Sequence, residues 1–313
     1  MAPVSSILVL TGPTASGKTD VALALAERLP VTLISMDSAM VYRGMDIGTA
    51  KPSAAVLARH PHALVDIRDP AEPYSAADFV RDADHAVRAA ERAGRLPVLV
   101  GGTMLYLRAF REGLADLPSA DPALRKAIAA EGEQRGWQAL YEELERIDPV
   151  AAAGTHPNNQ VRIQRALEVY RATGTPLSDW WRRRAGRGAG ERLGARLVEV
   201  AVVPGRRGDL AGPIDARFRA MLGAGLVEEV AGLRARGNLS LELPSMRSVG
   251  YRQVWAHLDG EFDLDELAER GAAATRSLAK RQLTWLNGWP HVVRLDPAAA
   301  AVQTERIRRL LRF

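Results

Sequence analysis

A glycine-rich motif close to the N-terminus constrains the fold of this chain more than any other feature of its sequence. The segment GPTASGKT, at positions 12–19, fits the pattern G-x-x-x-x-G-K-[ST] at every fixed position. It follows a short apolar run, 7–10, typical of a buried strand, and precedes apolar residues from 21 to 29 that are typical of a helix. Strand, glycine loop and helix in this order indicate a phosphate-binding loop, in which backbone N–H groups and the positive end of the helix dipole face an anion.

We expect every residue of this loop to contact a diphosphate or polyphosphate: Gly12, Pro13, Thr14, Ala15, Ser16, Gly17, Lys18 and Thr19. Gly12 and Gly17 permit the tight backbone turns. Lys18 supplies a mobile charge for the outer phosphate, and the Thr19 hydroxyl is placed to bind Mg2+. The motif identifies neither the ligand nor the reaction.

Length and composition indicate a globular protein with a mild basic excess. The chain has 313 residues, 47% of them hydrophobic and 25% charged, which allows one large domain plus an insertion. The net charge of +5 permits nucleic acid binding without requiring it. No apolar run approaches the ~20 residues that span a bilayer, no secretory signal is visible, and the lack of cysteine excludes disulfides and thiolate zinc sites. We therefore expect a cytoplasmic protein.

Strand patterns alternate with helix patterns in the first third of the chain. An apolar run at 31–36 ends at Asp37, and another at 97–100 is followed at once by Gly101, Gly102 and Thr103. This alternation predicts an α/β fold with a doubly wound parallel sheet, whose ligands lie beyond the C-terminal ends of the strands. Segments 12–19, 37–40 and 101–103 are therefore candidate site segments.

The pattern changes to short amphipathic helices between about residues 114 and 196. We interpret 114–196 as an all-helical insertion, and 1–113 together with 197–313 as one discontinuous catalytic core. Beta-type sequence returns at 196–203, and an edge strand is expected at 291–295. The arginine-rich stretch within 182–196 is consistent with nonspecific RNA affinity or with a disordered loop. The adjacent Trp180 and Trp181 fit core packing or stacking on RNA.

Several longer motifs resemble the tRNA dimethylallyltransferase (tRNA isopentenyltransferase) family, bacterial type. They include GPTASGKT, DSAMVYRGMDIGTAKP, LVGGTMLYLRAF, HPNNQVRIQRALEVY, PSMRSVGYRQVW and ATRSLAKRQLTWL, in family order from residue 7 to about 288. The resemblance implies a P-loop NTPase-like core with an inserted helical domain. It also implies transfer of a dimethylallyl group from dimethylallyl diphosphate to the N6 amine of the adenosine on the 3′ side of the anticodon, with Mg2+ as cofactor.

The resemblance assigns the chemistry to a few residues. Asp37 matches the family's general base, which would accept a proton from the adenine amine. Thr103 matches a threonine that contacts the target nucleotide, and Lys18 would stabilise the leaving diphosphate. Arg217 matches an arginine near the diphosphate. From the residues alone, Asp37 could instead cap a helix or form a loop ion pair, and Thr103 could cap the helix that follows it.

The tRNA partner would contact the chain through its anticodon stem-loop, and the target adenine must be flipped into the protein. The residues that match family contacts are Asp37, Ser38, Ala39, Met40, Thr103, Arg125, Val161, Arg162, Ile163, Gln164, Arg165, Arg247, Ser248, Val249, Gly250, Tyr251 and Arg252. The alternative for the arginines is solvated surface charge. Met40 replaces a residue that is often Leu in the family, and Asn159 stands where an acidic residue is common.

Three other functions fit parts of the same sequence. An isopentenyltransferase acting on free adenine nucleotides would share the core but has less need of a basic helical insertion. A P-loop kinase of a small metabolite could use Asp37 for Mg2+, although the Gly101–Thr103 segment argues against it. An ATP-driven RNA-binding switch protein is the non-catalytic alternative. We expect tRNA as the substrate and a monomeric protein.

Overall fold

The computed structural model describes residues 5–115, 117–118, 121–182, 188–205, 207–289, 291–296 and 299–311. The chain divides into two compact units, one formed by Met1–Arg111 with Ala189–Phe313 and the other by Glu112–Gly188. The chain therefore re-enters the first unit at Ala189, earlier than the boundary at residue 196 that the sequence led us to expect. The reason is that α10 (Ala189–Leu193) packs with the first unit: Ala189 is buried in its core, and Arg192 pairs with Asp84 at 2.7 Å. Positions 183–187 of the arginine-rich stretch lie outside the described residues.

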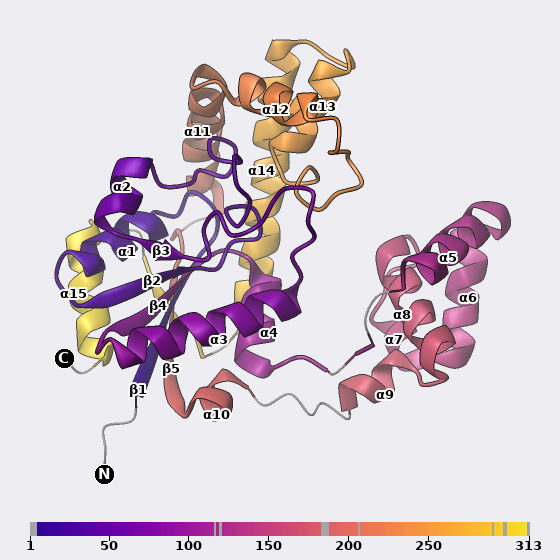
Figure 1. Ribbon diagram of the computed structural model, residues 1–313, viewed down its shortest axis with the longest axis horizontal. Helices are drawn as coiled ribbons and strands as arrows, with labels where there is room; N and C mark the ends of the chain where they lie inside the picture. The colour runs from indigo at the N-terminus through magenta and orange to yellow at the C-terminus, as the bar shows by residue number, and fades with distance from the viewer. Residues whose placement is uncertain are drawn as a thin grey trace. The chain divides into compact units, whose positions relative to one another are not determined.

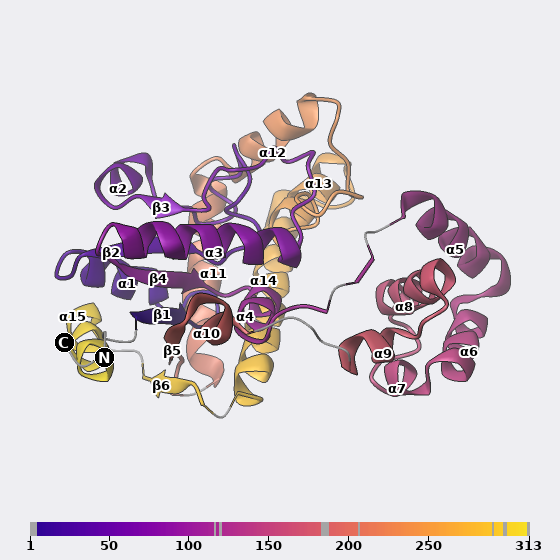
Figure 2. The same ribbon diagram turned by 60° about the horizontal axis from the view of Figure 1, so that its bottom comes forward.

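The described strands of the first unit form one parallel sheet, in the order β3-β2-β4-β1-β5-β6 (Figures 1 and 2). They are β1 (Ser5–Thr11), β2 (Val31–Ser35), β3 (His62–Ala63), β4 (Leu96–Gly101), β5 (Ala195–Val202) and β6 (Val293–Leu295). Strand β1 is central and pairs with both β4 and β5. Its continuous apolar run suits this position, because both faces of a parallel sheet are covered by helices.

Alternate residues of β1 enter two different cores. Leu8 and Leu10 pack with α1 (Lys18–Ala26) and α15 (Ala300–Leu311) on one face of the sheet. Ile7 and Val9 belong to the larger core on the other face. Figures 1 and 2 show α1 and α15 together on one side of the sheet. Successive side chains of a strand point to opposite faces of the sheet, so β1 packs against the helical layer on each side.

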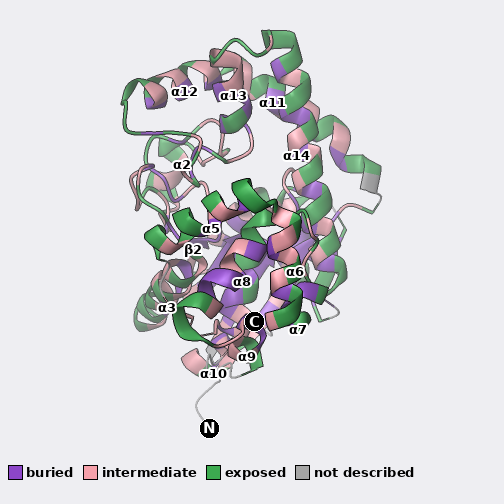
Figure 3. Ribbon diagram, turned by 90° about the vertical axis from the view of Figure 1, so that its right-hand side faces the viewer, coloured by how far each residue is buried: buried purple, intermediate pink, exposed green. Residues whose placement is uncertain are grey.

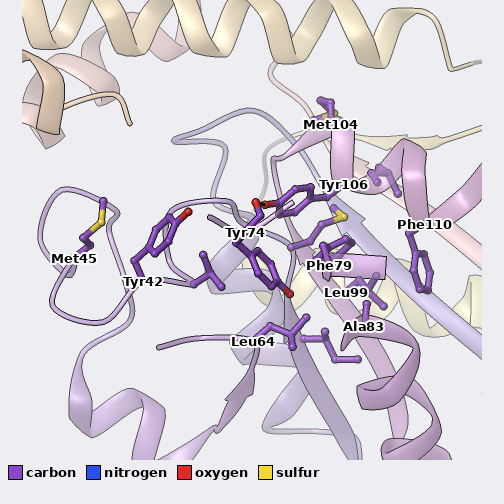
Figure 4. Packing of buried hydrophobic residues seen from close by; sticks show 14 of the residues in the cluster. Tyr42, Met45, Leu64, Tyr74, Phe79, Ala83, Leu99, Met104, Tyr106 and Phe110 are labelled. Carbon is purple, nitrogen blue, oxygen red and sulfur yellow. Dashed lines mark hydrogen bonds between the residues drawn. The ribbon is translucent and has the colours of Figure 1, made fainter. Parts of the chain in front are cut away.

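The larger core includes α3 (Ala76–Arg92) and α4 (Met104–Glu112). The rings of Phe79 and Tyr106 stack with centroids 4.6 Å apart, and the Tyr106 hydroxyl donates to the Tyr74 carbonyl (Figure 4). Ser75 and Asp78 form the capping box that begins α3. These contacts hold the segment that follows β4 in a fixed place.

The first unit contains further helices, most of them in the C-terminal part of the chain. They are α2 (Ala54–Arg59), α11 (Ala211–Gly223), α12 (Leu226–Ala235), α13 (Tyr251–Leu258) and α14 (Leu264–Asn287), with a 3₁₀ turn at Arg207–Leu210. Helices α2 and α13 and strand β3 were not predicted. Strand β3 has only two residues and exists because it pairs with β2, which no local pattern reveals. No helix among the described residues is long and apolar enough to cross a membrane.

The second unit is helical throughout its described residues. It contains α5 (Pro122–Arg135), α6 (Trp137–Ile147), α7 (Pro149–Ala153), α8 (Gln160–Thr173) and α9 (Leu177–Arg182). Its own core includes Ile128, Leu140, Ile163 and Leu167, so α8 carries many buried residues while α5 is mostly exposed (Figure 3). Trp180 packs against this core, whereas Trp181 is 46% exposed.

The predicted α/β class and the doubly wound parallel sheet are confirmed by this arrangement.

Candidate active site

The phosphate loop joins β1 to α1 and needs glycine at two positions. Gly12 has φ of 153°, and a Cβ there would lie 2.4 Å from the Val202 carbonyl oxygen. Gly17 has φ of 82° at the N-cap of α1, which is the left-handed region that favours glycine. The Ser16 hydroxyl is buried and has no hydrogen-bond partner among the described residues. An unpartnered buried hydroxyl inside a tight loop suits an additional ligand, because such a group is costly to leave unpaired.

Two cationic side chains lie against this loop. Lys18 begins α1, and its Nζ donates to the Pro13 carbonyl at 3.4 Å. Burial lowers the pKa of Lys18 to about 8, an effect that the charge of Asp37 opposes and that of Arg217 reinforces. Arg217 on α11 donates to the Thr14 hydroxyl. Burial also lowers the pKa of Arg217, and Asp37 again opposes it. Two partly desolvated cations next to inward N–H groups form a strong anion site.

Asp37 and Thr103 come together because β2 and β4 are neighbouring parallel strands. Asp37 Oδ1 accepts the N–H groups of Ala39 at 2.8 Å and Met40 at 3.2 Å. The Thr103 hydroxyl accepts the Ser38 N–H at 3.0 Å and contacts the Ser38 hydroxyl at 3.3 Å. One Asp37 oxygen therefore caps a turn, while the other makes no hydrogen bond with a described residue. The Thr103 side chain bonds to the Asp37–Met40 segment and not to the first turn of α4.

A cavity of about 490 Å³ in the first unit joins these groups. Its polar wall is built by Thr14, Lys18, Asp37, Ser38, Ala39, Gly102, Thr103 and Arg217. Its apolar wall is built by Ile214, Phe218, Met221, Val249, Leu278 and Trp285. The three candidate segments predicted from the sequence thus line one cavity. The arrangement can hold a ligand with an anionic end and a hydrocarbon end beside a carboxylate.

Two functional residues escaped the sequence interpretation. Gln282 on α14 accepts the Thr14 N–H at 2.9 Å and donates to the Gly102 carbonyl at 2.8 Å. Glu229 on α12 accepts the N–H groups of Ile47 at 2.8 Å and Gly48 at 3.3 Å, so it anchors the long loop after β2. The only available signal for Gln282 was its place on the buried face of a helix inside a family motif. Glu229 carried no signal, because its partners lie far away in the sequence.

The second group of predicted RNA contacts, 247–252, contributes its first three residues to the lining of the cavity. Arg247, Ser248 and Val249 line the cavity. Arg247 and Arg252 are exposed, and their side chains make no hydrogen bond or ion pair with a described residue. Gly250, with φ of 95°, is buried. Tyr251 is fully buried, and its hydroxyl donates to Glu229 at 2.5 Å. Burial does not fit the interpretation of Tyr251 as a direct RNA contact.

Predicted contacts in the insertion differ strongly in exposure. Val161 and Arg162 are exposed at the start of α8, while Ile163 is fully buried and has no surface for RNA. Arg125 and Arg165 both pair with the buried Glu168, at 2.9 and 3.0 Å.

Those two arginines are therefore not simply solvated charges. Arg125 ties α5 to α8 through Glu168, whereas Arg165 pairs with Glu168 within α8 and also donates to the Pro118 carbonyl at 2.9 Å. Burial alone would raise the pKa of Glu168, but hydrogen bonds from Arg125, the Asp121 N–H and Arg165 lower it overall. Gln164 donates to the Arg125 carbonyl at 2.9 Å and belongs to the same contact between the two helices.

Oxygen ligands for a divalent cation are available beside the phosphate loop. The Thr19 hydroxyl lies in the first turn of α1, where a bound diphosphate would add its own oxygens. Within the part of the chain that the structure describes, no group of three or more His, Asp or Glu side chains could hold a metal. This donor set suits Mg2+, which commonly binds through one or two protein groups and substrate phosphates.

Comparison with known proteins identifies relatives across nearly the whole chain. The family model described as IPP transferase matches residues 40–289. The chain is 56% identical over 297 residues to tRNA dimethylallyltransferase 2 of Hahella chejuensis, covering 91% of this chain and 89% of that protein. It is 54% identical over 305 residues to the tRNA dimethylallyltransferase of Chromohalobacter salexigens, covering 97% and 96%.

Solved structures agree with this assignment. The full-length tRNA isopentenylpyrophosphate transferase of Bacillus halodurans matches with a TM-score of 0.71 and 36% identity, covering 98% of this chain and 96% of that chain. A eukaryotic dimethylallyltransferase acting on tRNA matches with a TM-score of 0.79 at 23% identity, covering 97% of this chain and 78% of that chain, which shows a shared fold. The predicted P-loop NTPase-like fold is thereby confirmed. The chain belongs to the IPP transferase family and is an enzyme of the tRNA dimethylallyltransferase type.

Proposed function

We propose that this enzyme transfers a dimethylallyl group from dimethylallyl diphosphate to the N6 amine of the adenosine on the 3′ side of the anticodon in tRNAs. The observation that carries the proposal is one cavity that combines an anion cradle with a carboxylate and an apolar wall. Lys18 and Arg217 belong to the cradle, Asp37 supplies the carboxylate, and Phe218 belongs to the apolar wall. The relatives named tRNA dimethylallyltransferase support this choice of prenyl donor and tRNA acceptor.

The donor diphosphate would lie on the phosphate loop. The backbone N–H groups of Gly17, Lys18 and Thr19, the Lys18 ammonium and the Arg217 guanidinium would bind its oxygens, whereas Gln282 accepts the Thr14 N–H and the Pro13 carbonyl accepts the Ser16 N–H. Negative charge grows on the diphosphate as the C–O bond to the dimethylallyl group breaks. Cations that are already fixed and partly desolvated stabilise that charge more strongly than water does. The loop therefore serves both donor binding and leaving-group departure.

The acceptor amine would meet the donor carbon beside Asp37. The N6 lone pair forms the new N–C bond while the C–O bond breaks, and the amine must then lose a proton. Asp37 would accept that proton on the oxygen that has no hydrogen bond, since Oδ1 already holds Ala39 and Met40. Thr103 would orient the adenine, and its hydroxyl also fixes the Ser38 backbone. Adenine must leave its stack to reach the cavity.

We propose Mg2+ as the cofactor, held by the Thr19 hydroxyl and the substrate phosphates with Asp37 nearby. When bound, the cation would supply additional charge for the diphosphate. Exposed side chains would contact the anticodon stem-loop, among them Arg247, Arg252, Val161 and Arg162. Ser38, Ala39 and Met40 would line the path of the flipped base. We also propose that the enzyme acts in the cytoplasm, where its tRNA substrates are found, and as a monomer.

Incubation with radiolabelled dimethylallyl diphosphate and tRNA tests the proposal. Label should appear on tRNA, and diphosphate should be released in equal amount. A free-nucleotide isopentenyltransferase would label AMP, ADP or ATP, and a kinase would transfer phosphate from labelled ATP. An ATP-driven switch would hydrolyse ATP without labelling either acceptor. Absence of label on tRNA with any of these other products would contradict the proposed function.

A further inference from the structure

We propose that Gln282 is a positioning residue that holds the donor loop and the acceptor segment in one arrangement. The inference rests on the proposed function, because that function assigns one side of the cavity to a diphosphate donor and the other to an adenosine acceptor. Gln282 is only 7% exposed and lies on α14, far from both loops in the sequence.

The side chain of Gln282 connects the two loops directly. Its Oε1 accepts the Thr14 N–H at 2.9 Å, and its Nε2 donates to the Gly102 carbonyl at 2.8 Å. A carboxamide offers an acceptor and a donor at one end of a side chain, so these two partners fix its orientation. Thr14 belongs to the phosphate loop, and Gly102 directly precedes Thr103. One amide group therefore spans the two substrate sides.

The absence of a side chain at Gly102 allows the Gln282 amide to come close to the backbone of both loops. A Cβ at Gly102 would lie 2.4 Å from Gln282 Nε2 and 3.1 Å from the Gly12 carbonyl oxygen, so a larger residue would displace the amide. Thr14 is held a second time, because Arg217 donates to its hydroxyl. Its backbone is thus fixed from α14 and its side chain from α11. The loop is consequently ordered before a donor binds.

Loss of this connection should act on donor chemistry more than on tRNA binding. Without Gln282, the Thr14 peptide is free to rotate, and Lys18, which donates to the adjacent Pro13 carbonyl, loses part of its alignment. Preorganised donors act on the charge of the transition state, so both donor affinity and kcat should fall. Most tRNA affinity comes from phosphate contacts elsewhere and should change little.

The test compares Gln282→Met with Gln303→Met, a matched control. Gln303 is a fully buried glutamine on α15 whose amide donates to the Asp296 carbonyl and does not line the cavity. Calorimetry with inorganic diphosphate, kcat and KM for dimethylallyl diphosphate, and the Kd for tRNA are measured for each variant. We expect Gln282→Met to bind diphosphate about tenfold more weakly and to lose about tenfold in kcat. Gln303→Met should lose thermal stability only.

A second variant keeps the test decisive if Gln282→Met does not fold. Gly102→Ala should break the same connection from the other side and reproduce the loss of diphosphate affinity. When both changes are combined, their effects should not add, because each removes the same link. Normal diphosphate affinity and kcat in folded Gln282→Met or Gly102→Ala would overturn the inference. Absence of prenyl transfer by the unmodified enzyme would contradict the proposed function instead, and the diphosphate comparison would still decide the role of Gln282.

Discussion

The Asp37 carboxylate counteracts the effect of burial on the Lys18 ammonium. Burial lowers the pKa of Lys18 to about 8, and the negative charge of Asp37 raises it. Lys18 begins α1 and Asp37 follows β2, and both side chains line the same cavity. The residue proposed as general base therefore also helps to keep the phosphate-loop lysine protonated, so donor binding and proton transfer are electrostatically linked.

Diphosphate affinity should fall as the pH rises above about 8. Above this pH free Lys18 is mostly neutral, whereas a bound anion favours its protonated form, so binding must take up a proton. Affinity should then decrease by up to about tenfold per pH unit. Calorimetry across this range measures the effect. Lys18→Met provides the control, because it removes the titrating group while the ionisation of diphosphate itself remains. Parallel pH profiles for the two proteins would show that Lys18 does not titrate there.

Lys18→Met should stabilise the unliganded protein at neutral pH while weakening its activity. The folded-state pKa of Lys18, about 8, lies below its ordinary value of 10.5, so the charged form is penalised by folding. The penalty is fully present below pH 8 and disappears as the pH rises toward 10.5. Thermal denaturation with and without diphosphate measures this effect. We expect a higher Tm than wild type without the ligand, a smaller ligand-induced shift, and nearly unchanged tRNA affinity. A lower Tm without ligand would contradict the account.

Much of this site could be predicted because its signals are local. The phosphate loop is a continuous motif, and Asp37 and Thr103 each follow a strand directly. Since β2 and β4 pair in parallel, their C-terminal ends had to meet. The position of Gln282 could not be predicted, because it depends on how α14 packs against loops far away in the sequence.

The RNA-contact residues show the limit of transferring whole segments from a family. Ile163 lies in a predicted contact segment, yet the helical period that puts it with Leu167 also buries it in the insertion core. Tyr251 also lies in a predicted contact segment, but its side chain is buried and its hydroxyl donates a hydrogen bond to Glu229. The pairing of Arg125 with Glu168 depends on the packing of α5 against α8, which the sequence does not specify, whereas Arg165 and Glu168 lie three residues apart on one helix.

Binding of tRNA should depend on salt through the exposed arginines. If Arg247 and Arg252 each contact a phosphate, replacing either by Ala should flatten the log–log salt dependence of tRNA affinity by ~0.7–0.9. Arg162 should behave in the same way, because it is exposed. Its one side-chain hydrogen bond with a described residue is from Nη1 to the Gly154 carbonyl, at 3.2 Å. Filter binding at several salt concentrations gives the slopes. Identical slopes for wild type and the triple Ala variant would mean that these arginines remain in solvent.

Glu168→Ala should destabilise the insertion rather than the catalytic core. The substitution leaves Arg125 and the Asp121 N–H without their acceptor and leaves Arg165 with only the Pro118 carbonyl, for an expected cost near the lower end of about 3–5 kcal/mol, because both arginines are partly exposed. Since the pKa of Glu168 is lowered, its contribution should be lost as the pH falls through that lowered value. Hydrogen exchange should show faster exchange in α5 and α8. Glu133→Ala, an exposed residue of α5, is the control and should leave exchange unchanged.

The most direct test of the account is single-turnover prenylation of tRNA by Asp37→Asn. Asn retains the side-chain oxygen that accepts the Ala39 and Met40 N–H groups, but it does not accept the proton of the adenine amine. The rate of transfer should fall by about 10²–10⁴-fold. Loss of the Asp37 charge also lowers the pKa of Lys18, which is about 8 in the wild type, so the measurement is made well below pH 8 to keep Lys18 protonated in both proteins. Separate measurements should find donor binding retained and tRNA affinity reduced only modestly. A near-normal rate in the folded variant would contradict the assignment of Asp37 as the general base.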